Sequence, residues 1–212
     1  HPSGVLDLGG ATNSSSIKIV KPVTVAGTVD NSSLYGQHHA FGGRVTLAAG
    51  ARFTGSERFD IRDGILDLDG QVFTKTGANS VQIVGTTAVT NEPSGTAFSV
   101  QAGELLFADS VTFSGTSAST VEVAAAARLA VYLVEHPIPY SVRAAADVAL
   151  DIHDTSSVQN TNLNIYAGPL QLDGDIRATG FAHSLQSLRG PVSGTGGLTA
   201  ASGELLLAHP DN

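Results

Sequence analysis

Residues 64–72 read Gly-Ile-Leu-Asp-Leu-Asp-Gly-Gln-Val, and residues 168–176 repeat the pattern as Gly-Pro-Leu-Gln-Leu-Asp-Gly-Asp-Ile. Both stretches begin with a glycine that is followed by leucine at every second position. Successive side chains of a strand point to opposite faces, so Leu66 and Leu68 share one face and Asp67 lies on the other. Gly, Asn, Asp and Ser separate such stretches every few residues, which is typical of short strands joined by turns.

Two units recur along the chain. The glycine–leucine unit, with leucine or phenylalanine at its end, starts at Gly4, Gly64, Gly103, Gly168 and Gly203. The second unit is a strand, an alanine-rich turn and another strand: 45–53 matches 121–129 at an offset of 76, and a weaker copy follows at 140–148, a further 19 along. Because 76 is four times 19 and the glycine–leucine units lie near multiples of the same step, we predict a coil of about 20 residues repeated about ten times.

Stacked coils explain how such short strands can form a core. A single coil cannot bury its inward Leu, Val and Ile side chains, whereas coils stacked at about 4.8 Å enclose them and pair the backbone groups. We therefore predict an all-β fold, a right-handed parallel β-helix (a β-solenoid), formed by residues 1–212 as a single segment. The chain has no initiator methionine and stops within a repeat-like stretch, so we expect the segment to belong to a longer protein.

Two other folds fit parts of the pattern. The alanine-rich runs at 121–134 and 142–152 have the intrinsic propensity to form helices. The matching run at 48–51 contains a glycine, which favours a turn in all copies. An antiparallel β-sandwich would explain the turn signals, but it does not predict matching turns at multiples of one step.

The composition agrees with a repetitive β architecture and excludes several functions. Charged residues make up 14% of the chain, against roughly 25% in ordinary soluble domains, while 42% is hydrophobic and there are 24 glycines. The net charge of −8 and the 11 scattered basic residues predict no nucleic-acid partner. There is no cysteine, hence no disulfide. The chain has no apolar run of roughly 18 residues or more, the length that a membrane helix needs, so we expect no membrane insertion of this segment.

A stretch near the C-terminus carries a family resemblance. Val192-Ser-Gly-Thr-Gly-Gly-Leu-Thr-Ala-Ala-Ser-Gly-Glu-Leu-Leu-Leu207 resembles the autotransporter-associated β-strand repeat, in which a small-Gly-Thr-Gly-Gly-Leu-Thr stretch precedes a polar spacer and Gly-x-Leu-x-Leu. Residues 200–202 and 208–212 depart from the spacer and tail that many copies carry. The opening residues 4–10 also look like passenger-domain sequence, and the resemblance covers about thirty residues at the two ends.

The resemblance implies a passenger of a type V secretion system. Such a segment would be extracellular or on the surface of a Gram-negative bacterium after export through the outer membrane. Because segments of this family serve mostly as scaffolds or adhesive surfaces, we predict a non-enzymatic passenger segment that acts as an adhesive or display stalk. Its expected partner is a host-surface protein or glycan, or another stalk through self-association.

The sequence predicts no catalytic residue. The Gly-x-Ser-x-Gly turn that presents a nucleophilic serine in hydrolases is absent. The alternative is a polysaccharide-active β-helix, a lyase or hydrolase, or a carbohydrate-binding accessory domain. Its candidate residues are Asp60, Arg62, Asp63, Asp67 and Asp69, although any strand that alternates leucine with polar residues needs such a solvated face. A row of charged side chains across three adjacent coils in a groove would favour the enzyme.

Neither a metal site nor a cofactor is predicted. Asp151 and His153 lie on one face of an expected strand and could form a pair of ligands, but zinc needs three or four. His38 and His39 fall in a polar loop, where we expect their side chains to be exposed to solvent. The Asp-x-Asp-Gly stretch at 67–70 begins like a calcium-binding loop but lacks its later acceptors and its terminal glutamate.

Loops that leave the coil are the expected binding surface. One is 30–43, and the other is 135–140, in which Pro137 and Pro139 prevent a regular interior strand. Aromatic and histidine side chains on such loops could stack on sugar rings or contact a host protein. The predicted binding residues are Tyr35, His38, His39, Phe41, His136 and Tyr140; that they only cap the coil or cover an edge remains open.

Overall fold

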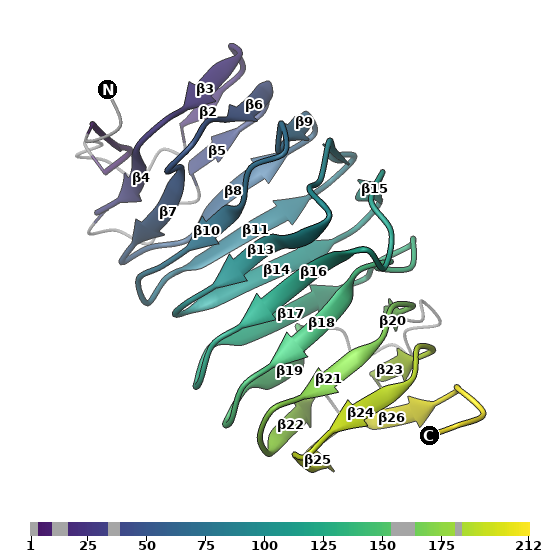
Figure 1. Ribbon diagram of the computed structural model, residues 1–212. Coiled ribbons are helices and arrows are strands. Elements are labelled where there is room, and N and C mark those ends of the chain that lie inside the picture. Colours follow the sequence, from purple (N-terminus) through teal and green to yellow (C-terminus); the bar gives the residue numbers. More distant parts are fainter. Residues whose placement is uncertain (1–3, 10–16, 34–38, 154–163, 181–183) are drawn as a thin grey trace.

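The computed structural model describes residues 4–9, 17–33, 39–153, 164–180 and 184–212. Within these ranges the chain forms strands and turns and no helix, and therefore no helix of the length and hydropathy needed to cross a membrane. The strands stack as successive turns of a parallel β-solenoid (Figure 1). This confirms the all-β parallel β-helix, with about eight turns in place of the predicted ten.

Each turn contributes one strand to sheet A and one to sheet B, all but one of the described turns add a strand on a third face, and neighbouring strands pair in parallel. Sheet A contains β1 (Val5–Asp7), β4 (Thr28–Asn31), β7 (Arg52–Gly55), β10 (Phe73–Lys75), β13 (Gly95–Val100), β16 (Ser119–Val123), β18 (Ser141–Ala144), β21 (Leu170–Leu172) and β24 (Val192–Gly194). Sheet B contains β2 (Lys18–Ile19), β5 (His39–Phe41), β8 (Phe59–Arg62), β11 (Ser80–Val84), β14 (Glu104–Ala108), β17 (Arg128–Tyr132), β19 (Ala149–Ile152), β22 (Ile176–Thr179) and β25 (Leu198–Ala200).

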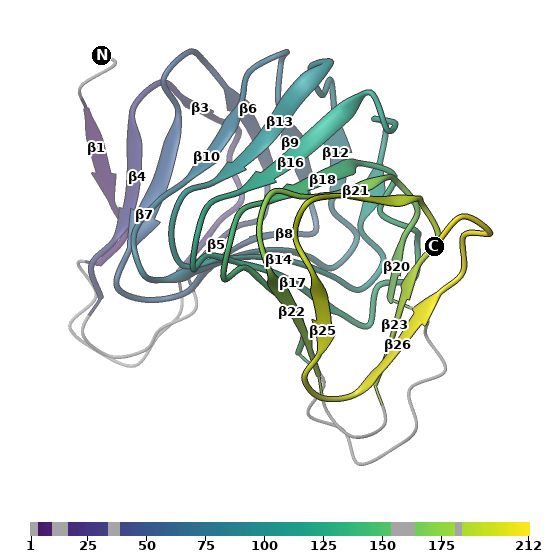
Figure 2. The same ribbon diagram turned by 60° about the horizontal axis from the view of Figure 1, so that its bottom comes forward.

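The third face consists of two separate sheets. Sheet C contains β3 (Val23–Val25), β6 (Arg44–Leu47), β9 (Ile65–Asp67), β12 (Ala88–Thr90) and β15 (Thr112–Phe113). Sheet D contains β20 (Asn164–Tyr166), β23 (Leu185–Leu188) and β26 (Glu204–Leu207), which lie side by side at the C-terminal end (Figure 2). Sheets A and B therefore run through all the described turns, while the strand ladder of the third face is interrupted between β15 of sheet C and β20 of sheet D.

The segment 133–140 occupies the third face where sheet C ends. It contains Pro137 and Pro139, which cannot donate to a strand ladder, and Ile138 forms an isolated parallel bridge with Tyr166 of sheet D. Tyr140 is fully buried and packs with Phe98, Phe107 and Phe113 at centroid distances of 5.3–6.5 Å. Its hydroxyl donates to Glu92 Oε1 at 2.7 Å. The segment 133–140 contains no strand, and the buried ring of Tyr140, the aromatic plug, fills the core at this position instead.

The pairing register gives coils longer than the sequence predicts. Val5 pairs with Thr28, Thr28 with Arg52, and Val121 with Val142, so the residue number advances by 23, 24 and 21 from one turn to the next. The predicted step is too short for two reasons. The copies at 121–129 and 140–148 pair at an offset of 21 and not 19. The first two copies lie at different corners, because 48–51 joins sheet C to sheet A and 124–127 joins sheet A to sheet B. The offset between these two copies therefore does not span whole turns of the solenoid.

The alanine-rich runs form turns and not helices. Gly50, Ala126 and Asp147 each occupy the third position of such a turn, and all have positive φ, at 85°, 60° and 61°. This left-handed conformation suits glycine and costs other residues energy because Cβ approaches the neighbouring carbonyl. The glycine in the first copy therefore marks a turn position that the other two copies fill with a less suitable residue.

Inward-facing residues fill the solenoid with stacked aromatic and aliphatic side chains. Phe53 and Phe73 stack at a centroid distance of 4.2 Å, and Phe98 continues the row at 5.6 Å. Lys75 faces the same interior and is fully buried. Its Nζ donates to the carbonyl oxygens of Thr76, Gly77 and Ala102 at 2.6–3.0 Å, which satisfies all three donors of the ammonium group.

The strained turn at 124–127 gives a test of the fold. We expect Ala126→Gly to raise the free energy of unfolding by roughly 0.5–1 kcal/mol, because relief of the left-handed strain outweighs the entropy that glycine adds to the unfolded chain. Ala125, the exposed neighbour in the same turn, does not have positive φ, so Ala125→Gly should lower stability by a similar amount. Denaturant unfolding of the two variants measures both effects, and equal signs would contradict the turn geometry.

Candidate functional site

The outer face of sheet B brings charged residues of successive turns into rows. Glu104 of β14 pairs with Arg128 of β17, which pairs with Ala149 of β19 and then with Arg177 of β22. In the next row, Ala130 pairs with Asp151, and Asp151 pairs with Thr179. These positions alternate with buried leucines and isoleucines, so their side chains point away from the core.

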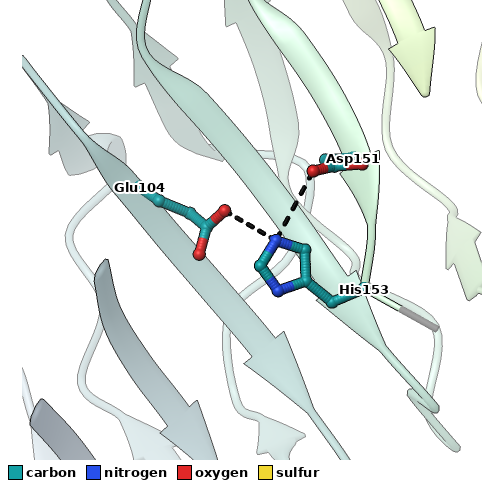
Figure 3. Close-up of side chains that lie close together, drawn as sticks. All are labelled: Glu104, Asp151 and His153. Carbon is teal, nitrogen blue, oxygen red and sulfur yellow. Dashed lines mark ion pairs between the residues drawn. The ribbon is translucent and has the colours of Figure 1, made fainter. Parts of the chain in front are cut away.

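Glu104, Asp151 and His153 meet across these rows (Figure 3). His153 follows β19, and its Nε2 lies 2.8 Å from Glu104 Oε2 and 3.4 Å from Asp151 Oδ2. Glu104 and Asp151 belong to the two strands that flank β17. One imidazole nitrogen therefore joins two carboxylates from turns that are not direct neighbours.

Hydroxyl groups hold the second oxygen of each carboxylate. Ser80 Oγ donates to Glu104 Oε1 at 2.7 Å, and Thr179 Oγ1 donates to Asp151 Oδ1 at 2.8 Å. Each carboxylate thus has one oxygen fixed by the adjacent strand and one turned toward His153. Arg128 Nη1 approaches Asp151 Oδ2 at 3.8 Å, beyond hydrogen-bonding distance.

The cluster is ionised at neutral pH. Hydrogen bonds to Asp151 and Glu104 raise the pKa of His153 to about 9, against the opposing effect of burial. Burial opposes ionisation of Glu104, but hydrogen bonds from His153 and Ser80 outweigh it and hold its pKa below the usual range. The pKa of Asp151 is lowered in the same way, with hydrogen bonds from His153 and Thr179 overcoming burial.

An open groove adjoins the cluster. Its volume is about 480 Å³, and it is lined by side chains from β17, β19, β22 and the segment before β26, among them Arg128, Asp151, His153, Arg177, Thr179 and Ser202. Four successive turns thus contribute to one groove. Its lining combines cations, carboxylates and hydroxyl groups, the kinds of group that orient a polar ligand.

A small apolar cluster on the same outer face separates this site from a second group of charges. Val84, Leu106, Ala108 and Ala130 are each at most 2% exposed, and Tyr132 packs against them. Beyond this apolar cluster, Asp60 is 2% exposed and is held by Arg58 at 2.7 Å and Arg62 at 2.9 Å. The predicted shared face of Asp60 and Arg62 is confirmed by this contact.

The other acidic residues of 60–69 serve the turns of the solenoid. Asp67 is paired with Arg44 and accepts a hydrogen bond from Asn91 Nδ2 at 2.8 Å. Asp63 pairs with Lys18 at 3.1 Å. Asp69 has a φ of 46° and donates its backbone N–H to Asp67. The carboxylates of Asp63 and Asp67 tie different turns together, and neither residue lines the groove.

The loop residues predicted to bind a ligand do not form one surface. Tyr35 and His38 lie outside the described residues. His39 and Phe41 are buried in β5, where His39 Nδ1 accepts the backbone N–H of Ile17 at 3.0 Å. Tyr140 is the aromatic plug of the third face, and His136 is exposed on the segment 133–140. Of the described residues in this set, His136 alone is available at the surface.

Sequence reasoning found two members of the cluster and missed the third. The alternation around residue 152 pairs Asp151 with His153, and the structure places them together. Glu104 lies in the glycine–leucine unit at 103–107, where it reads as the ordinary solvent-facing residue of a strand. The signal that could have found it is the register of β14, β17 and β19, which the incorrect coil length concealed.

Comparison of the chain with protein-family models, with curated proteins and with solved structures found no match in any of the three. The resemblance of residues 192–207 to a passenger repeat therefore stays a prediction.

The ion cluster predicts a distinct dependence of stability on pH. The pKa of His153 is about 9 in the folded chain and about 6.5 when unfolded, so its contribution is complete below pH 6.5 and is lost as the pH rises to 9. The lowered pKa values of Glu104 and Asp151 mean that their contribution is lost as the pH falls below about 4. Thermal unfolding should show His153→Gln losing stability relative to the native chain most strongly between about pH 5 and 6.5.

The quantity to compare is the difference in stability between the native chain and His153→Gln at each pH. Burial lowers the pKa of Lys75 to about 8, which adds stability with rising pH in both proteins and cancels in the difference. His136→Gln, a change on the exposed segment 133–140, provides the control and should leave the profile of the native chain unchanged. A pH-independent difference for His153→Gln would show that His153 is not charged in the folded state.

Proposed function

We propose that the chain is a β-solenoid segment of a secreted or surface-displayed bacterial protein and that it binds an acidic glycan along the outer face of sheet B. The fold supplies a long scaffold with a repeated core, which suits a display or adhesive stalk. Residues 192–207, which resemble the passenger repeat, span one strand on each of three faces, β24, β25 and β26. They support export through the outer membrane as the route to the cell surface.

The groove beside the Glu104–Asp151–His153 cluster carries the proposal. Four turns line it with side chains that can donate or accept hydrogen bonds. A polymer that lies across the strands would contact polar side chains from all four turns. This groove replaces the loops at 30–43 and 135–140 as the proposed contact surface, because most of their described aromatic and histidine side chains are buried.

The cations of the groove favour an anionic ligand. Arg128 and Arg177 occupy one row with Ala149 between them, which places their backbones two strand spacings, or about 10 Å, apart. Guanidinium groups bind carboxylates and sulfates through paired hydrogen bonds. The chain carries a net charge of −8, so a basic pair facing the groove attracts an anion locally against the net charge of the chain.

Cleavage of such a polysaccharide is a second candidate function. Glu104, Arg128 and Asp151 come from adjacent strands of sheet B, so charged residues of three successive turns lie in two neighbouring rows beside a groove. This is the arrangement that polysaccharide-active β-helices use. It ranks second because both carboxylates have lowered pKa values, which leaves the cluster without the protonated carboxyl group that glycoside hydrolysis uses as its general acid.

Binding to immobilised acidic polysaccharides tests the first function. We expect the native chain to be retained on polygalacturonate or alginate and not on a neutral glucan. The double change Arg128→Gln and Arg177→Gln should weaken binding at least about tenfold, because each lost charged contact contributes on the order of 1 kcal/mol. Surface plasmon resonance at physiological salt measures the affinities.

Arg52→Gln is the matched control, since Arg52 is an exposed arginine of sheet A on another face. It should bind as the native chain does. Equal binding by the double variant, or no retention on either acidic polymer, would contradict the proposal. Release of unsaturated or reducing ends during incubation, abolished by Glu104→Gln, would establish cleavage instead.

A further inference from the structure

We infer that Glu104, Asp151 and His153 form a binding site for a zinc ion beside the groove. The sequence predicts no metal site because only two of the ligands are close in the chain. The inference does not rest on the proposed binding of a glycan, since it follows from the arrangement of the three side chains.

The three ligand atoms are close enough to surround one ion. His153 Nε2, one oxygen of Glu104 and one oxygen of Asp151 all lie within 4.8 Å of one another. Zinc binds nitrogen and oxygen at about 2.0–2.2 Å in a tetrahedron, so ligand atoms around it are about 3.4 Å apart. The separation of 3.4 Å between Nε2 and Asp151 Oδ2 already fits, and the 2.8 Å contact with Glu104 needs only a small rotation of that side chain.

The donor types and their charge suit zinc. An imidazole nitrogen with two carboxylate oxygens is a borderline ligand set, which favours zinc over calcium or magnesium, whose sites are made of oxygen. When zinc occupies the position of the Nε2 proton, that proton leaves to solvent. The neutral imidazole and the two carboxylates then balance the double positive charge of the ion.

Neighbouring hydroxyl groups already orient the carboxylates for this role. The hydrogen bonds from Ser80 and Thr179 engage the oxygens that face away from His153. Bonds of this kind fix ligand orientation in metal sites and contribute to metal affinity. The side chain of Glu104 is only 9% exposed, so its oxygen cannot turn freely toward water.

The surroundings leave a fourth position open. Three protein ligands with one free position are typical of zinc sites that bind water or a further ligand. The side chain of His153 is 38% exposed, and Asp151 and His153 both line the groove, which gives water access to the ion. Arg128 can move away because its side chain is 58% exposed and its contact with Asp151 is a long one, at 3.8 Å. Lys75 stays on the core side, held by three carbonyls.

Isothermal titration of the chelator-treated chain with zinc chloride tests the inference. We expect one zinc ion per chain and binding at least about tenfold weaker in Glu104→Gln, Asp151→Asn and His153→Gln. His153→Gln keeps an amide donor for Glu104 but lacks the imidazole nitrogen, so it separates metal ligation from the ion pairs that support the fold. Far-UV circular dichroism checks that each variant is folded.

His209→Gln is the matched control, because His209 also lies beside a carboxylate, with its Nδ1 3.7 Å from Asp211. It should bind zinc as the native chain does. X-ray absorption at the zinc edge needs no variant and should show one imidazole among oxygen ligands. No binding at millimolar zinc, unchanged affinity in folded His153→Gln, or a spectrum with two or more imidazoles would overturn the inference.

Discussion

The parallel pairing of each turn with the next is the constraint on which the whole molecule depends. A single turn has almost no backbone partners within itself, so its strands are stable only between neighbours that continue the register. Side chains in equivalent positions then lie about 4.8 Å apart in rows. The stacked pair of Phe73 and Phe98 and the charged row through Glu104, Arg128 and Arg177 are both consequences of this stacking.

The sequence predicts the strands well and their faces poorly. Alternating leucines after a glycine identify strands, and all five units contain one. Those strands, however, belong to four different sheets: β1 and β21 to A, β14 to B, β9 to C and β26 to D. The motif reflects a local structural requirement: a glycine at a corner, followed by a strand whose leucines point inward. Corners that lead into different sheets share this requirement. Counting such motifs therefore cannot give the length of a turn, because it treats different corners as one.

The candidate site shows the same division between local and non-local information. Asp151 and His153 are two positions apart on one strand and its continuation, so alternation is enough to pair them. Glu104 joins them through two pairing steps across β17, and each step depends on a coil length that varies along the chain. For Tyr140, the local sequence predicts an exposed position, whereas the structure buries the side chain. Its position beside two prolines suggested an exposed loop, but the missing strand of that turn leaves a gap in the core that only a large side chain fills.

The turn with the missing strand also connects two stacks whose third faces are not continuous. Among the described strands, those of sheets A and B alone cross this turn, so the third face has no unbroken ladder there. Glu104 and Asp151 lie on β14 and β19, one strand to either side of β17 in that same turn. Bending the solenoid at this turn therefore changes the distance between the two carboxylates. A group that is bound between them opposes that change. The curvature of the solenoid at this turn and the contacts within its charged cluster are in this way linked.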